Sequence, residues 1–164
     1  MLLCLMWAAV TLAAVAAPRA GMKNVYLHAE GTKTSAELAA TCTNGVPASK
    51  QHPAGYPIND YTVVTPAANW TSYAVKKEWY DRHLISGPHY MAFTHTSDPY
   101  GAFKCQYTCN AATNCNSYFV SYEDIGTGTE HLSCVLFDAI LGPVEFEPST
   151  DNIGAGGYDK LCQS

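Results

Sequence analysis

The sequence predicts an α+β fold in which one helix is fastened by disulfides to neighbouring strands. Asp98 and Pro99 form a helix-start signal, because aspartate caps free amide groups and proline suits the first helical position. A helix from Pro99 to about Ala111 places Cys105 and Cys109 one turn apart on one face. Strand-like segments follow this helix, so its cysteine face has strands to which it can bond.

The same helix predicts a second stripe beside its cysteines. Tyr100, Phe103 and Tyr107 lie three or four residues apart, so they share one side of a helix. We therefore expect an apolar stripe adjacent to the cysteine face.

Cysteine number predicts a disulfide framework. Seven cysteines are present, and the six beyond the N-terminal apolar segment are an even number, as in secreted disulfide-bonded domains. Spacings of C-x3-C and C-x5-C differ from the C-x2-C pairs of common zinc sites, which disfavours zinc. The residues alone leave the pairing open. The six cysteines are Cys42, Cys105, Cys109, Cys115, Cys134 and Cys162.

The N-terminus predicts secretion. Residues 2–17 are apolar and uncharged, and they are too short for an ordinary membrane-spanning helix. They end in small residues, with an A-x-A cleavage pattern at Ala14-Val15-Ala16. We therefore interpret residues 1–17 as a signal peptide and expect an extracellular protein. No second apolar segment of spanning length follows, so we expect no membrane insertion.

Composition narrows the classes of partner. The chain has 164 residues, enough for one domain, and a formal net charge of -5 without a cluster of lysine or arginine. This distribution argues against nucleic acid as a partner. Eleven tyrosines are present. Tyrosine is common both at half-buried strand positions, which we favour, and at binding surfaces.

The first half of the chain predicts few regular elements. Residues 34–45 predict a short helix with a capping box and an Asn-Gly stop, which places Cys42 in its last turn. Residues 46–60 are rich in proline, glycine and polar side chains, and predict an irregular loop. Residues 61–64 predict a strand.

Residues 73–85 have an ambiguous period and fit either a helix or a strand. Gly87-Pro88 predicts the end of this segment. Residues 89–95 alternate as a strand does. Further on, the next two strands, 116–123 and 132–138, predict a hairpin around a Gly/Thr-rich turn. Two short segments near the C-terminus, 144–146 and 158–161, are further strand candidates.

No catalytic constellation stands out. The six histidines are scattered, and neither H-E-x-x-H nor G-x-S-x-G occurs. The carboxylates at Glu123-Asp124 and at Glu145 and Glu147 lie near predicted turns, where solvation is the usual state. The DIGTGTE segment, residues 124–130, fits a hairpin turn better than a calcium loop, because it lacks alternating carboxylates. We expect no catalytic residue, cofactor or metal.

Asn69-Trp70-Thr71 is a glycosylation sequon, which predicts an exposed loop and places a glycan on Asn69. Aromatic residues gather around it, and a glycan-binding surface would expose several of them on one shallow face. The predicted ligand-binding residues are Trp70, Tyr73, Trp79 and Tyr80, with Tyr56 and Tyr61 as further candidates.

A set of short motifs accompanies the cysteine frame over about residues 87–162. They are Tyr90 to Thr94, Asp98, Cys105, Cys109, Cys115, Phe119 to Glu123, Cys134-Val135-Leu136, Gly142-Pro143-Val144 and Gly154 to Tyr158. Together they resemble the PAN/apple module, in particular its single-module form in secreted fungal proteins.

The resemblance implies a small antiparallel sheet that carries one disulfide-bonded helix. Residues 87–164 would form the module, and residues 18–86 an N-terminal extension packed on it. By order, the cysteines would pair as Cys105–Cys134, Cys109–Cys115 and Cys42–Cys162.

The resemblance also implies recognition of an extracellular glycan or protein, without catalysis. One alternative is a structural protein of the extracellular matrix or cell wall. Another is a hydrolase with a site in residues 46–86.

Overall fold

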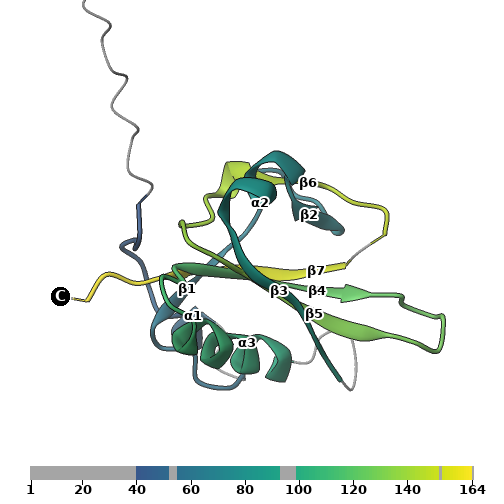
Figure 1. Ribbon diagram of the computed structural model, residues 1–164, viewed down its shortest axis with the longest axis horizontal. Coiled ribbons are helices and arrows are strands. Elements are labelled where there is room, and N and C mark those ends of the chain that lie inside the picture. The colour runs from purple at the N-terminus through teal and green to yellow at the C-terminus, as the bar shows by residue number, and fades with distance from the viewer. Residues whose placement is uncertain (1–39, 52–54, 93–98, 152, 164) are drawn as a thin grey trace, which may run out of the picture. The chain divides into compact units, whose positions relative to one another are not determined.

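A five-stranded antiparallel sheet forms the centre of the computed structural model, which describes residues 40–51, 55–92, 99–151 and 153–163 (Figure 1). The predicted α+β class with an antiparallel sheet is confirmed. In spatial order its strands are β1 (Tyr61–Val64), β7 (Ile153–Lys160), β4 (Ser117–Glu123), β5 (His131–Phe137) and β3 (Leu84–Met91).

Each face of this sheet is covered by a different layer. Helix α3 (Tyr100–Ala111) and the short helix α1 (Ala48–Gln51) lie on one face. Helix α2 (Lys77–His83) and a second sheet, made of β2 (Tyr73–Val75) and β6 (Phe146–Pro148), lie on the other (Figure 1). Side chains of a strand alternate between faces, so β4 and β5 contribute to both cores.

Three disulfides join these elements. Cys105–Cys134 bonds α3 to β5, with Cα atoms 5.8 Å apart, and Cys109–Cys115 bonds α3 to the segment before β4. Cys42–Cys162 closes a separation of 120 residues. These are the three pairs that the resemblance implies. In the chain-entropy model the longest loop contributes most, roughly 4–5 kcal/mol.

Helix α3 lies very close to the sheet at its first turn. A Cβ atom on Gly101 would overlap the Leu132 side chain of β5. Only glycine therefore allows this approach, and Leu132 is fully buried beneath the helix.

The helix predicted over residues 34–45 is wrong for its described part, residues 40–45. This part is extended, and Thr43 forms a parallel bridge to Leu161. The Thr43 amide donates to the Lys160 carbonyl, and the Cys162 amide donates to the Thr43 carbonyl. Together with the disulfide at Cys42, these bonds hold the segment beside the C-terminus. Residues 34–39, and the predicted signal peptide over 1–17, lie outside the described residues.

Residues 73–85 contain both alternatives in turn, since β2 is followed by α2 and then by the start of β3. The prediction that Gly87-Pro88 ends this segment is wrong. Both residues lie inside β3, and the peptide bond between them is cis. Gly87 has a φ of +119°, and a Cβ atom there would meet the Cys134 carbonyl. The pairing of β3 with β5 shifts register on both sides of Ser86.

The boundary expected between residues 86 and 87 falls within β3. Strand β1, from the expected extension, pairs with β7 in the same sheet. The predicted strand residues 93–95 and the capping residue Asp98 lie outside the described residues.

The remaining predictions agree more closely with the structure. Strand β1 and the hairpin of β4 and β5 occur where they are predicted. The loop predicted over residues 46–60 contains α1 in addition to irregular chain. Near the C-terminus, a 3-10 turn occupies Pro143–Glu145, so β6 begins only at Phe146.

Within the described residues, no helix is long and apolar enough to cross a membrane.

Buried polar side chains hold the loop that follows β5. Ser117 donates its hydroxyl to the Ala139 carbonyl at 2.6 Å, and the Leu141 amide donates to Asp159 Oδ1 at 2.6 Å. Asp159 is only 4% exposed. Burial raises the pKa of its carboxyl to about 7, although the Leu141 amide opposes this shift.

We expect Asp159→Asn to stabilise the protein at alkaline pH. Because the folded-state pKa is raised, the native state binds the extra proton, so stability falls as pH rises from about 4 to about 7. Asparagine keeps an acceptor for the Leu141 amide and cannot ionise. Urea unfolding at pH 8 should show a gain on the order of 3 kcal/mol. At about pH 4, where the wild-type carboxyl is protonated when folded, the gain should vanish; an equal effect at both pH values would contradict the assignment.

Candidate functional site

Two of the four predicted ligand-binding aromatics are core residues. Tyr73 and Trp79 are 8% and 7% exposed. The Tyr73 ring packs edge-on against Phe146, and the Trp79 ring packs edge-on against Phe137, with centroids 5.3 and 4.9 Å apart. They fill the layer between the sheet and α2, so a ligand cannot reach their faces. Their burial contradicts the prediction that they are exposed ligand-binding residues.

The residues around the sequon divide between surface and core. Asn69 is exposed on the loop between β1 and β2, as the sequon predicts. Trp70 and Tyr80 are half-buried, and both pack against the core on the α2 side. Tyr61 is completely buried on β1. The aromatics of residues 61–80 therefore do not form one shallow exposed face.

An exposed aromatic surface occurs instead on the outer side of α3. We call it the aromatic face and define it by Tyr56, Tyr100, Phe103 and Tyr107. Tyr56, Tyr100 and Tyr107 are 46%, 37% and 58% exposed, and Phe103 is half-buried among them. Large aromatic side chains gathered at the surface are typical of interaction sites.

The rings of the aromatic face touch one another in series. Tyr56 stacks on Phe103 with centroids 5.0 Å apart, and lies 4.9 Å from Tyr100. Phe103 meets Tyr107 edge-on at 5.1 Å. The Lys104 ammonium lies 4.6 Å from the centre of the Tyr100 ring. Four neighbouring rings and one cation thus form a continuous surface.

The helix presents this face because its other side is already committed. Its buried residues include Gly101, Cys105 and Cys109. Gly101 approaches β5 closely, Cys105 is bonded to Cys134 in β5, and Cys109 is bonded to Cys115 in the segment before β4. Gln106 is also buried, and its Nε2 donates to the Pro57 carbonyl at 3.0 Å. That bond attaches the loop that carries Tyr56 to the helix.

The sequence predicts the part of the aromatic face that lies on α3. The spacing of Tyr100, Phe103 and Tyr107 predicts their shared stripe, and the two cysteines beside it indicate which side faces the sheet. Tyr56 is one of the predicted ligand-binding aromatics, and the other members of that set lie in residues 61–80, outside the aromatic face. Its place beside the helix depends on the Gln106 bond across 49 residues, which no local pattern indicates.

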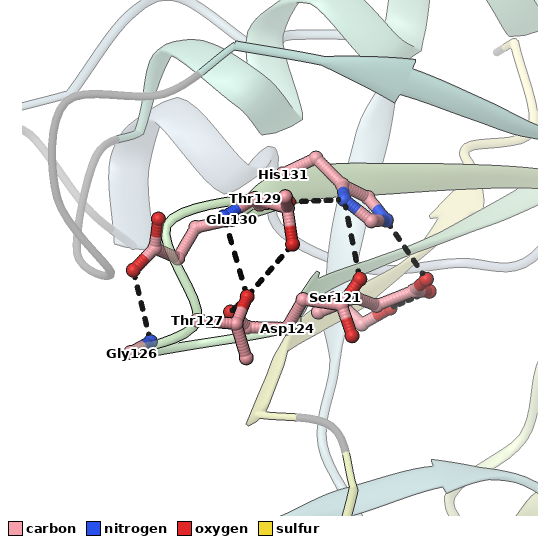
Figure 2. A network of polar contacts seen from close by, with 8 residues as sticks. Ser121, Asp124, Gly126, Thr127, Thr129, Glu130 and His131 are labelled. Atoms are coloured by element: carbon pink, nitrogen blue, oxygen red, sulfur yellow. Dashed lines mark hydrogen bonds and ion pairs between the residues drawn. The ribbon is translucent and has the colours of Figure 1, made fainter.

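The turn between β4 and β5 is closed by its own polar groups (Figure 2). Thr127 Oγ1 donates to the Asp124 carbonyl at 2.6 Å, and the Gly126 amide donates to Glu130 Oε1 at 2.9 Å. The hairpin predicted for this segment is confirmed. Among the described residues, no three histidine, cysteine or acidic side chains are placed to hold a metal ion.

His131 lies between two acceptors at the base of this turn (Figure 2). Its Nδ1 is 3.0 Å from the Thr129 carbonyl, and its Nε2 is 3.2 Å from Glu123 Oε2. Both contacts favour the protonated ring. The bond to the Thr129 carbonyl raises the pKa of His131 most, and the bond and charge of Glu123 and the charge of Asp124 add to it.

We expect the turn to loosen as pH rises through neutrality. A histidine with a raised folded-state pKa contributes stability below its ordinary value of about 6.5 and loses that contribution as pH rises through the raised value. Amide exchange of Gly126 and Thr129, corrected for intrinsic rates, should therefore be more protected at about pH 6 than at about pH 8.

His131→Asn serves as the control, because it removes the titrating ring. The difference in protection between the two pH values should disappear in this variant. An NMR titration that placed the His131 pKa below its ordinary value would contradict the assignment.

Comparisons with known proteins find no match for this chain. No protein-family model, no curated protein and no solved structure matches it. Its own residues and their geometry are therefore the basis for inferring its function.

Proposed function

We propose that this protein is an extracellular binding module whose aromatic face recognises glycan chains. The observation that carries the proposal is the exposed series of Tyr56, Tyr100, Phe103 and Tyr107. Three disulfides fit an extracellular setting. The resemblance of the cysteine frame to PAN/apple modules supports a role in recognition.

The chemistry of the aromatic face suits a sugar chain. Aromatic rings offer flat apolar surfaces for the C–H faces of sugar rings, and the tyrosine hydroxyls can exchange hydrogen bonds with sugar hydroxyls. Tyrosine also loses little side-chain entropy on binding, because it has only two rotatable torsions. Adjacent rings extend the surface, as a chain of sugars requires.

Rigid attachment of this face favours binding. Helix α3 is bonded to strand β5 at Cys105 and to the segment before β4 at Cys109. The loop that carries Tyr56 is hydrogen-bonded to the helix through Gln106. The rings are therefore ordered before a ligand arrives, so less entropy is lost on binding.

Edge strand β3 gives little support to the alternative of a structural protein of the extracellular matrix or cell wall. An edge that recruits another chain needs a regular row of free amide groups. Edge strand β3 has two register shifts, and Pro88 in it has no amide to donate. This edge is therefore poorly suited to adding a strand from another molecule.

We expect Tyr107→Ala and Tyr56→Ala each to weaken glycan binding by about tenfold or more, as truncation of a central aromatic contact does. A glycan array with the oxidised full chain, including chitin and β-glucan fragments, first identifies the ligand. Titration of the best ligand then measures the loss.

Tyr90→Ala is the matched control. Tyr90 is 61% exposed, close to the 58% of Tyr107, but lies on edge strand β3. It should leave glycan affinity unchanged. An array without binding, from protein whose three disulfides are intact, would contradict the glycan proposal, and a pull-down from extracellular extract would then test a protein partner for the aromatic face.

A further inference from the structure

A groove opens on the face of the sheet opposite α3, between helix α2 and strands β4 and β5. Its volume is about 320 Å³, within the range of small-molecule sites. Phe119 and Val135 provide apolar lining, and Ser121 and Ser133 lie beside them on the same strands. The groove is separate from the aromatic face, because these residues alternate with those that pack beneath α3.

One hydroxyl in this groove has no partner. Ser133 is 1% exposed, and its Oγ makes no hydrogen bond within the part of the chain that the structure describes. Its cross-strand neighbour Ser121 instead donates to Glu123 Oε1 at 3.3 Å. A buried hydroxyl without a partner is unfavourable, and Ser133 lines the groove, so an occupant that reached its Oγ would supply the missing hydrogen bond.

Two carboxylates and one ammonium group line the groove, and His131 lies against one of the carboxylates. Lys77 and Asp81 form an ion pair at 2.6 Å on α2, and Glu123 adds a second carboxylate from β4. The Tyr80 hydroxyl lies near both acids: burial raises its pKa most, and the charges of Glu123 and Asp81 raise it further.

Glu123 retains capacity for a ligand. Its Oε2 accepts from His131, and its Oε1 accepts from Ser121. A carboxylate has about four acceptor positions, so positions remain for a donor in the groove.

We infer that the groove binds a small hydroxylated amine of the hexosamine class. The ammonium group would bind Glu123, a ring hydroxyl would pair with Ser133, and the carbon face of the ring would lie on Phe119 and Val135. An acetylated or unsubstituted sugar has the hydroxyls but no cation for Glu123. The inference does not depend on the aromatic face, because the two surfaces share no residue.

The test is an NMR titration of the oxidised full chain with glucosamine, N-acetylglucosamine and glucose at about pH 7, where most of the amine is protonated. We expect saturable shifts for glucosamine at the amides of Ser121, Ser133 and Val135. Its affinity should exceed that of the two neutral sugars by about tenfold, as a hydrogen bond between charged groups predicts.

Two variants separate the roles in the groove. Glu123→Gln should weaken glucosamine binding by about tenfold and reduce the preference over glucose. Ser133→Ala should weaken all three sugars by about threefold to tenfold. The free Ser133→Ala protein should be at least as stable as the wild type, because no existing hydrogen bond is lost. If Ser133 had a purely structural role, the free Ser133→Ala protein would be less stable than the wild type.

Asp60→Asn is the control, because it removes an exposed carboxylate beside β1, at the far edge of the sheet. It should leave glucosamine binding unchanged. The inference is overturned if glucosamine does not saturate, if the three sugars bind equally, or if the shifts cluster on the aromatic face. The glycan array with the Tyr107→Ala variant tests the aromatic face separately. Either proposal can therefore be contradicted while the other is supported.

Discussion

The attachment of helix α3 to strand β5 is the contact on which the rest of the molecule depends. Gly101 brings the first turn of the helix against Leu132, and the Cys105–Cys134 bond holds its middle to the same strand. Cys109–Cys115 then holds its last turn to the chain that enters β4. With one side of the helix committed in this way, Tyr100, Phe103 and Tyr107 have only the solvent side left. A structural constraint therefore creates the surface that we propose binds glycans.

The central sheet separates two environments because its strands alternate. Residues such as Tyr118 and Leu132 pack under α3, while Phe119 and Val135 pack under α2 and the small second sheet. The first environment contains the disulfides Cys105–Cys134 and Cys109–Cys115. The second includes a groove that is lined by the buried Ser133 hydroxyl, two carboxylates and one ammonium group. Strands β4 and β5 support both environments, so one central hairpin lies beneath two chemically different surfaces.

Tyrosine illustrates how one residue type serves both purposes. Five of the described tyrosines are buried: Tyr61, Tyr73, Tyr118, Tyr122 and Tyr158. Tyr118 and Tyr158 stack with centroids 4.7 Å apart, and Tyr61 packs edge-on against Tyr118. Four others are exposed: Tyr56, Tyr90, Tyr100 and Tyr107. A high tyrosine content predicts both kinds of position, because the side chain pairs a large apolar area with a polar tip. Composition cannot assign an individual tyrosine to either kind.

Local sequence patterns predict the class of fold, the helix with its two cysteines, the β4–β5 hairpin and the aromatic stripe on α3. Each of these depends on local spacing or turn chemistry, which act between residues close in the chain. Local patterns do not predict that Tyr73 and Trp79 are buried, that Cys42 lies in an extended segment, or that Gly87-Pro88 continues a strand; these features depend on the folded chain. The same patterns do not predict that Tyr56 joins the helix or that Ser133 lines a groove. These outcomes depend on contacts between residues distant in the chain, and such contacts override local preference when they bury more surface or satisfy more hydrogen bonds.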